Sequence, residues 1–291
     1  MIRVLELRVY GLQFTVYSWD YHNWKLETKN WKLIFALLLI PCYLSSQTPA
    51  YKLVKTIPTT ATILSSDKLG NCYVVNGKQE LLKISPEGEM LSAYTNKSLG
   101  QISFVGTTNP LKILVYYVDY STIITLDNTL SQTGRINLLE LGSNKASAAC
   151  VGLDNNIWIY DEVLYKLRKL DDRLNVLAET EDLNVLFSLP VRANFLLEKD
   201  NYLYLNDTSK GILVFDTYGT YYKTIPLKGL TDFQKVQEWL VYFQHGKLFS
   251  YHLLTFTTEE VNLPGSDAIN AVVEKDRLFI LRKEQLDVYS Y

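Results

Sequence analysis

The stretch EKDNYLYLNDTSKGILVFDTYGTYYKTIP, residues 198–226, contains three apolar runs separated by polar segments. The first run, YLYL from Tyr202, follows EKDN, and the second, ILVFD, ends at Asp216 just before TYGT. The third begins at Tyr221. Polar and Gly-containing clusters between apolar runs are typical of hairpin turns. This stretch therefore predicts consecutive antiparallel strands.

The same pattern recurs along the chain at intervals of about 40 residues, which is the period of a β-propeller blade. The first series of runs is CYVV from Cys72, ILVYYV from Ile113, IWIY from Ile157, YLYL from Tyr202, WLVYF from Trp239 and LFIL from Leu278. A second series keeps the same phase and ends at Ser85, Asp127, Asp171, Asp216, His252 and Ser290. Each repeat thus predicts a four-stranded antiparallel blade.

The character of the runs favours a propeller over a sandwich or barrel. Runs such as ILVYYV and WLVYF are continuously apolar, as expected for strands covered on both faces by neighbouring blades, whereas a sandwich would show more alternation. The innermost strands are expected to carry small residues near the axis, namely Ala61, Ser103, Ala148, Ala149, Ala193 and Ala271. Blade 5 departs from this rule with FQKVQ at 233–237.

The two ends of the repeat region predict how the ring closes. The last blade stops after its third strand at Tyr291, and YKLVKTIP at 51–58 is similar to the fourth strand of blade 4, at 221–227. An N-terminal strand that completes the last blade removes an exposed edge. We therefore predict an all-β, six-bladed β-propeller over residues 51–291, with blade boundaries near 60, 101, 143, 191, 231 and 266.

This periodicity resembles the six-bladed β-propeller superfamily, in particular its NHL-like and quinoprotein-like groups. The chain has no WD dipeptide, kelch glycine pair or quinone-docking motif. The resemblance therefore implies a fold but assigns no family, and it transfers no site residues.

Residues 29–47 have the order of a signal peptide: a basic start, a short apolar core and small polar residues after it. This order predicts export to the periplasm or cell envelope, with a mature N-terminus between Cys42 and Thr48. Lipidation of Cys42, which would tether the protein to a membrane, is the alternative, although Pro41 stands where a small residue is needed. Residues 1–28 are interpreted as a misassigned or extended leader. The leader resembles those of Bacteroidota envelope proteins.

Composition argues against several classes of function. The net charge is −2, and basic residues are scattered singly, whereas nucleic-acid binders carry a basic stripe. Cys72 and Cys150 fall on strands two blades apart, which predicts two free, buried thiols. His245 and His252 are interpreted as a turn residue and a strand-end residue. No catalytic or phosphate-binding motif is present, and we expect no metal and no cofactor.

Polar residues at the entrances of the innermost strands are the candidate ligand-binding residues, because these strands are otherwise small or apolar. They are Lys145, Arg192, Asn194, Lys235, Asp267 and Asn270. Together they predict a mildly basic channel mouth that holds a protein or a small anionic ligand. The expected function is that of an exported, non-catalytic binding or assembly module. The alternative is a channel-mouth enzyme, either a hydrolase or lyase or a cofactor-dependent dehydrogenase.

Overall fold

The structure is a computed structural model that describes residues 3–9, 12–18, 51–142 and 145–291. It contains two compact units, the first within Met1–Gln47 and the second Thr48–Tyr291. The first unit includes an antiparallel hairpin of β1 (Arg3–Val9) and β2 (Leu12–Ser18). The predicted signal peptide and Cys42 lie outside the described residues. Within the described residues, no helix combines the length and hydropathy needed to span a membrane.

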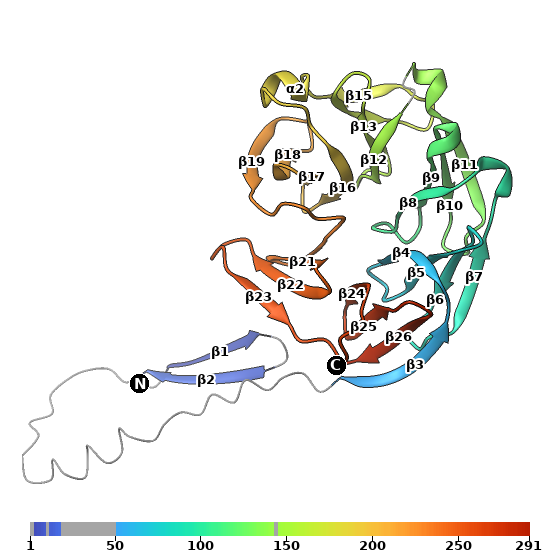
Figure 1. Ribbon diagram of the computed structural model, residues 1–291. Helices are drawn as coiled ribbons and strands as arrows, with labels where there is room; N and C mark the ends of the chain where they lie inside the picture. The colour runs from blue at the N-terminus through green and yellow to red at the C-terminus, as the bar shows by residue number, and fades with distance from the viewer. Residues whose placement is uncertain (1–2, 10–11, 19–50, 143–144) are drawn as a thin grey trace, which may run out of the picture. The chain divides into compact units, whose positions relative to one another are not determined.

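The second unit is a ring of six four-stranded antiparallel sheets, which confirms the predicted six-bladed β-propeller (Figure 1). The innermost strands are β4 (Ala61–Ser66), β8 (Ile102–Gly106), β12 (Ala146–Val151), β16 (Ala193–Lys199), β20 (Gln234–Val236) and β24 (Asn270–Glu274). The second strands are β5 (Cys72–Asn76), β9 (Ile113–Tyr117), β13 (Ile157–Asp161), β17 (Tyr202–Asp207), β21 (Trp239–Gln244) and β25 (Arg277–Leu281).

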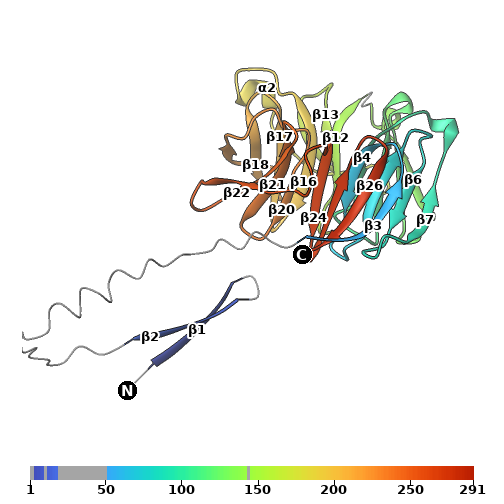
Figure 2. The same ribbon diagram turned by 60° about the horizontal axis from the view of Figure 1, so that its bottom comes forward.

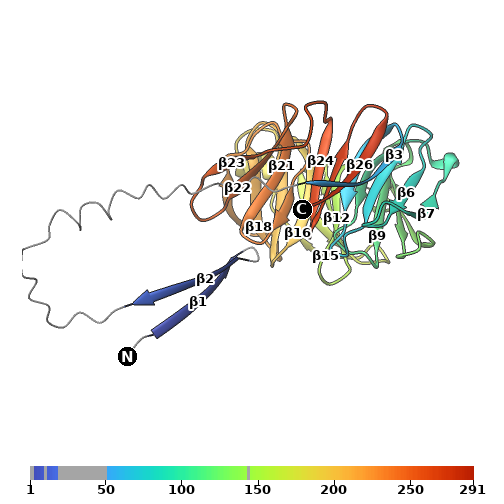
Figure 3. The ribbon, with the colours of Figure 1, turned by 90° about the horizontal axis from the view of Figure 1, so that it is seen from below.

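The third strands are β6 (Leu81–Ile84), β10 (Thr122–Leu126), β14 (Lys166–Leu170), β18 (Gly211–Asp216), β22 (Lys247–His252) and β26 (Gln285–Ser290). The outermost strands are β7 (Met90–Tyr94), β11 (Gln132–Asn137), β15 (Val176–Glu179), β19 (Tyr221–Ile225), β23 (Thr258–Val261) and β3 (Lys52–Pro58). Short helical turns lie in the connections: η1 (Lys97–Leu99), η2 (Val118–Tyr120), η3 (Leu138–Leu141) and α2 (Leu183–Leu186). Seen from the side, the strands cross the thickness of a disc (Figures 2 and 3).

The core lies between the blades. Every residue of β9, β10 and β13 is buried, whereas the outermost strands are mostly exposed. Six clusters of buried apolar residues each join two neighbouring blades. This is why the second and third strands have continuous apolar runs: both faces of each sheet are covered.

The ring closes as the sequence predicts, because β3 pairs with β26 in the last blade (Figure 1). Ile57 packs against the core between blades 6 and 1, and Thr56 donates a 2.7 Å hydrogen bond to Asp287. Leu53 and Val54 stay 51% and 40% exposed. The closing strand is therefore held by its ladder and its C-terminal half, and Leu53 and Val54 contribute little buried apolar surface.

Carboxylates at the ends of the third strands of blades 2, 3 and 4 cap the turns that follow. Asp171 accepts hydrogen bonds from the backbone N–H groups of Arg173 and Asn175, both at 2.8 Å, and Asp127 and Asp216 make equivalent pairs. In blade 5, His252 Nδ1 accepts from the backbone of Leu254 and Thr255. His252 thus replaces the Asp of blades 2, 3 and 4 as a turn cap.

A second set of caps, at the ends of the second strands, is not evident from the sequence pattern. Asp207, at the end of β17, accepts from the backbone N–H groups of Ser209 and Lys210 at 2.7 and 2.8 Å. Asp161 and Asn76 occupy the corresponding positions of β13 and β5. Unlike the half-buried caps of the third strands, Asp161 and Asp207 are fully buried.

Both cysteines of the propeller are free and buried, as the blade assignment predicts. Cys72 lies in β5 of blade 1 and Cys150 in β12 of blade 3. Burial, the largest cause in each case, raises the pKa of both thiols far above the usual range. Since the thiolate is the reactive form, both side chains act as small apolar groups of the core.

Candidate functional site

The inner wall of blade 5 differs from the other five. Its innermost strand β20 has three residues, and residues 231–233, which follow the buried Leu230, line the channel. Asn194 Nδ2 donates to the carbonyls of Leu230 and Thr231, both at 3.0 Å, and Asn206 Nδ2 donates to that of Leu230 at 2.7 Å. Side-chain amides of blade 4 therefore hold this segment in place of a backbone ladder.

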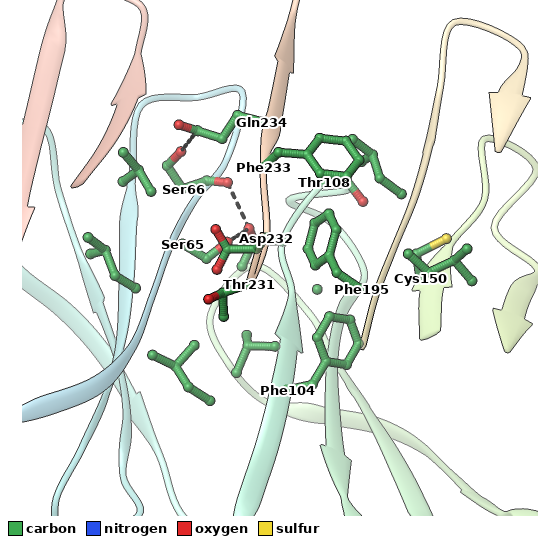
Figure 4. A pocket seen from close by; sticks show the side chains of 18 of the residues that line it. Ser65, Ser66, Phe104, Thr108, Cys150, Phe195, Thr231, Asp232, Phe233 and Gln234 are labelled. Carbon is green, nitrogen blue, oxygen red and sulfur yellow. Dashed lines mark hydrogen bonds between the residues drawn. The ribbon is translucent and has the colours of Figure 1, made fainter. Parts of the chain in front are cut away.

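Gln234 fixes the other end of this segment. Its Nε2 donates to Ser66 Oγ at 2.9 Å (Figure 4). The same Nε2 donates to the carbonyl of Val273, and Oε1 accepts from Val273 N, both at 2.9 Å. One side chain thus links blades 5, 6 and 1 at the channel. Residues 231–233 are anchored on both sides and have little freedom to leave the wall.

A cavity of about 320 Å³ occupies the channel. One part of its lining is formed by hydroxyl-bearing residues: Ser65, Ser66, Thr107, Thr108 and Thr231. Another part carries the rings of Phe104, Phe195 and Phe233, and the Phe195 and Phe233 rings meet edge to face with centroids 5.1 Å apart. Hydroxyls together with aromatic rings give a lining suited to an amphipathic ligand.

Asp232 is the acidic group that blade 5 adds to this cavity. Figure 4 shows Asp232 and Thr231 projecting into the space that Ser65 and the rings of Phe104 and Phe195 also border. Within the part of the chain that the structure describes, its carboxylate has neither a hydrogen-bond donor nor an ion-pair partner. Burial raises the pKa of Asp232 from 3.8 to about 6.

The predicted ligand-binding residues fall into two groups. Asn194, Lys235 and Asn270 line the cavity, whereas Lys145, Arg192 and Asp267 do not. Six connections lead into the innermost strands. Among their described residues, only those of the connection into blade 5 line the cavity.

The charged members of the predicted set have local roles. Lys145 pairs with Glu162 at 2.7 Å, and Asp267 pairs with Arg282. The Arg192 side chain is exposed, while its backbone N–H donates to Asp207 at 2.7 Å. Lys235 is buried and pairs with Asp200. The role of these residues in ligand binding stays a prediction.

Sequence reasoning did not select Asp232, Thr231 or the three Phe rings. The available signal was the departure of FQKVQ at 233–237 from the small residues of the other inner strands. That departure lies in and beside the short strand β20, next to the loop that supplies Thr231 and Asp232, but periodicity does not indicate which side chains of a loop point inward.

The ionisable groups that line the cavity are Asp232, Glu274, Lys68, Lys199, Lys235 and Cys150. Burial, the largest cause, raises the pKa of Glu274, and the positive charges of Lys199 and Lys275 oppose this rise. In the described residues, no group of three or more His, Cys, Asp and Glu side chains is arranged to hold a metal ion.

The structure is similar to several solved propellers. It matches virginiamycin B lyase from Staphylococcus aureus with a TM-score of 0.57 at 12% identity, over 83% of this chain and 99% of that one. It matches the WD40 domain of Neurospora crassa Pan2 with a TM-score of 0.56 at 10% identity, over 82% and 95%. A streptogramin B lyase gives a TM-score of 0.52 at 15% identity, over 79% and 78%.

At these identities the likeness shows the fold alone. No protein-family model and no curated protein sequence matches the chain.

Proposed function

We propose that this protein is a non-catalytic binding module of the cell envelope, and that its channel cavity receives the ligand or a side chain of the partner. The amphipathic lining of the cavity carries the proposal. Hydroxyls and aromatic rings face the same space, and the segment that supplies Thr231 and Asp232 is held by amide side chains at both ends. Concave sites with an apolar wall and a few fixed polar groups are typical of small-ligand binding.

A fragment screen tests this proposal, with anionic, neutral and cationic compounds and with thermal shift and ligand-observed NMR as readouts. Thr231→Trp fills the cavity from an exposed position. Tyr218→Trp, at a residue 81% exposed in a turn outside the cavity lining, is the matched control. We expect fragments to bind wild type and the control, and Thr231→Trp to abolish the binding.

If Thr231→Trp folds normally and binds the same fragments as tightly as wild type, the channel is not the binding site. Mass analysis of each bound fragment after incubation addresses the alternative of a channel-mouth enzyme, because turnover would change the fragment. Recovery of every fragment unchanged is the result expected of a binding module.

Export is the second part of the proposal and rests on the sequence of residues 29–47. We expect the chain, expressed from Met1 in a Gram-negative host, to be recovered from the envelope with its N-terminus between Cys42 and Thr48. N-terminal sequencing together with intact mass measures this, and a diacylglyceryl mass increment on Cys42 would identify lipidation. Recovery of the purified protein with Met1 in place contradicts export.

A further inference from the structure

We infer that the ligand of the channel carries a protonated amine, which Asp232 binds, and an apolar body that lies against the rings of Phe104, Phe195 and Phe233. This inference rests on the proposed function and specifies the ligand class of the same cavity. It follows from three features of the described residues: an acid without a partner, a fixed position for that acid, and the charges already neutralised around it.

The first feature is the state of Asp232. Glu274, the other acid of the lining, also accepts no hydrogen bond from the described residues, but the positive charges of Lys199 and Lys275 act on it, whereas burial alone shifts the pKa of Asp232. The buried acids of the propeller are all satisfied: Asp67, for example, accepts from the backbone of Leu69 and Asn71 and from the Tyr73 hydroxyl. Glu198 accepts from the Trp158 ring at 2.7 Å and from Leu153 N at 2.8 Å. Half-buried Asp232 has no such partner among the described residues. A carboxylate accepts hydrogen bonds only, so its complement is a donor, and a charged donor binds it most strongly.

The second feature is position. Asp232 lies between Thr231, whose carbonyl accepts from Asn194, and Phe233, which is 3% exposed. Gln234 then fixes the backbone to blades 6 and 1. An acid held in this way loses little further conformational freedom when a ligand binds, which favours affinity.

The third feature is the charge of the surroundings, which favours a cation over an anion. Lys235 Nζ is engaged by Asp200 and by the carbonyl of Gln237 at 2.7 Å. Lys199 acts on Glu274 and opposes the rise in its pKa, and Lys68, the remaining lysine of the lining, is exposed to solvent. Aromatic faces attract cations as well. A metal ion is a poor alternative, because Asp232 belongs to no cluster of potential ligands in the part of the chain described.

The cavity also limits the size of the ligand. Its volume of about 320 Å³ lies at the small end of the ~300–1,000 Å³ range of ligand sites. A primary ammonium with a six- to eight-carbon body matches this space. Such a group can belong to a free amine or to the lysine side chain of a partner, and the two sources present the same chemistry to Asp232.

Three pairs of probes test the inference by calorimetry at pH 7.5: 2-phenylethylamine with 2-phenylethanol, cyclohexylmethylamine with cyclohexylmethanol, and n-hexylamine with n-hexanol. We expect wild type to bind at least one amine about tenfold or more tightly than its alcohol, since a charge-assisted hydrogen bond contributes a factor of roughly 10 to 100. Asp232→Asn should remove this preference and leave the affinity for the alcohol unchanged. One additional probe, Nα-acetyl-lysine N-methylamide, represents the lysine side chain of a partner protein.

Glu274→Gln is the matched control inside the cavity, and Glu87→Gln, on the surface, is the control outside it. Both are expected to keep the amine preference. The affinity for the amine should also fall as pH decreases below about 6, because protonation of Asp232 removes the acceptor charge. Burial raises the pKa of Cys150, which therefore stays neutral over that range, and measurement in Glu274→Gln excludes the titration of Glu274.

Equal binding of amine and alcohol in all three pairs overturns the inference, as does an amine preference that survives Asp232→Asn or is lost in Glu274→Gln. Failure of the proposed function would give a different result. In that case Thr231→Trp would not reduce the binding of any fragment, whether anionic, neutral or cationic. Anionic or neutral fragments that bind in the channel while amines do not would overturn this inference alone.

Discussion

Replacement of residues 51–58 by a Gly–Ser segment of equal length is expected to unfold the propeller or to cause it to aggregate. The change removes β3 from the last blade and leaves β26 as an open edge. Leu286 and Val288 of β26 are fully buried in the wild type and lose the cover of Ile57 on one side. Tyr51, which meets Tyr289 and Tyr291 edge to face, is lost as well.

Most of the expected loss of stability comes from the backbone hydrogen bonds between β3 and β26. Apolar burial by β3 contributes less, since Leu53 and Val54 are half exposed. Six residue pairs join β3 to β26, and net contributions of about 0.5–1.5 kcal/mol per hydrogen bond sum to several kcal/mol. Partial burial of Ile57 adds at most roughly 1.5–3 kcal/mol. The total is comparable to the ~5–15 kcal/mol stability of a typical domain.

Circular dichroism melting and size-exclusion chromatography measure the effect. A synthetic peptide of residues 51–58 added in trans should restore part of the stability, and the same peptide with Ile57→Asp should not. A replaced chain that melts within a few degrees of wild type, as a monomer, contradicts the closure by β3.

Asp207→Ala is expected to destabilise the propeller by roughly 3–5 kcal/mol, because it leaves several buried donors without an acceptor. The fully buried Asp207 carboxylate accepts from the backbone of Arg192, Ser209 and Lys210 and from the Ser209 hydroxyl, at 2.6–2.8 Å. Lys210 also donates to the carbonyl of Pro190. Asp207 thus fixes the connection into blade 4 to the hairpin beside it, and its loss should lower the melting temperature by about 10 °C or more.

The pH dependence of this effect has a definite sign. Burial alone would raise the pKa of Asp207, but hydrogen bonds from Ser209, Arg192 and Lys210 more than offset it and hold the pKa below the usual 3.8. A depressed pKa in the folded state gives stability that is present above the unfolded-state pKa and is lost as pH falls through the folded-state value. Wild type and Asp207→Ala should therefore differ most above pH ~4 and converge in stronger acid.

Asp127→Ala is the matched control, because Asp127 also accepts two backbone N–H groups and one hydroxyl of the turn after it, but in a turn that is open to solvent. Water replaces the lost acceptor there, so the decrease in melting temperature should be much smaller. Equal decreases for the two variants would show that burial of Asp207 does not determine its contribution.

The sequence predicts this fold well because a propeller repeats one unit, and each copy tests the same assignment. Phase and turn residues place the second and third strands within a residue or two, as ILVFD and β18 illustrate. The third-strand caps follow from the same pattern, since Asp before a tight turn has a local role. The buried caps of the second strands cannot be predicted in this way, because neighbouring segments of the chain cover Asp207 and Asp161.

The candidate site is predicted less well for a related reason. Asn194, Lys235 and Asn270 reach the cavity because they lie at or within innermost strands, whose position repeats. Asp232 lies in a connection that enters the channel only because Asn194 and Asn206, distant in sequence, hold it there. Such contacts have no periodic signature, so they emerge only from the three-dimensional arrangement.

The closure of the ring also constrains the order of events in folding. Thr56 and Asp287, which bond across the last blade, are separated by 231 residues. The strand that the ribosome makes first in the propeller is therefore the last to find its partner, since β26 is complete only when Ser290 has been added. Contacts of such long sequence separation form slowly. Throughout this interval two strand edges stay open, and open edges are the surfaces through which nascent chains associate.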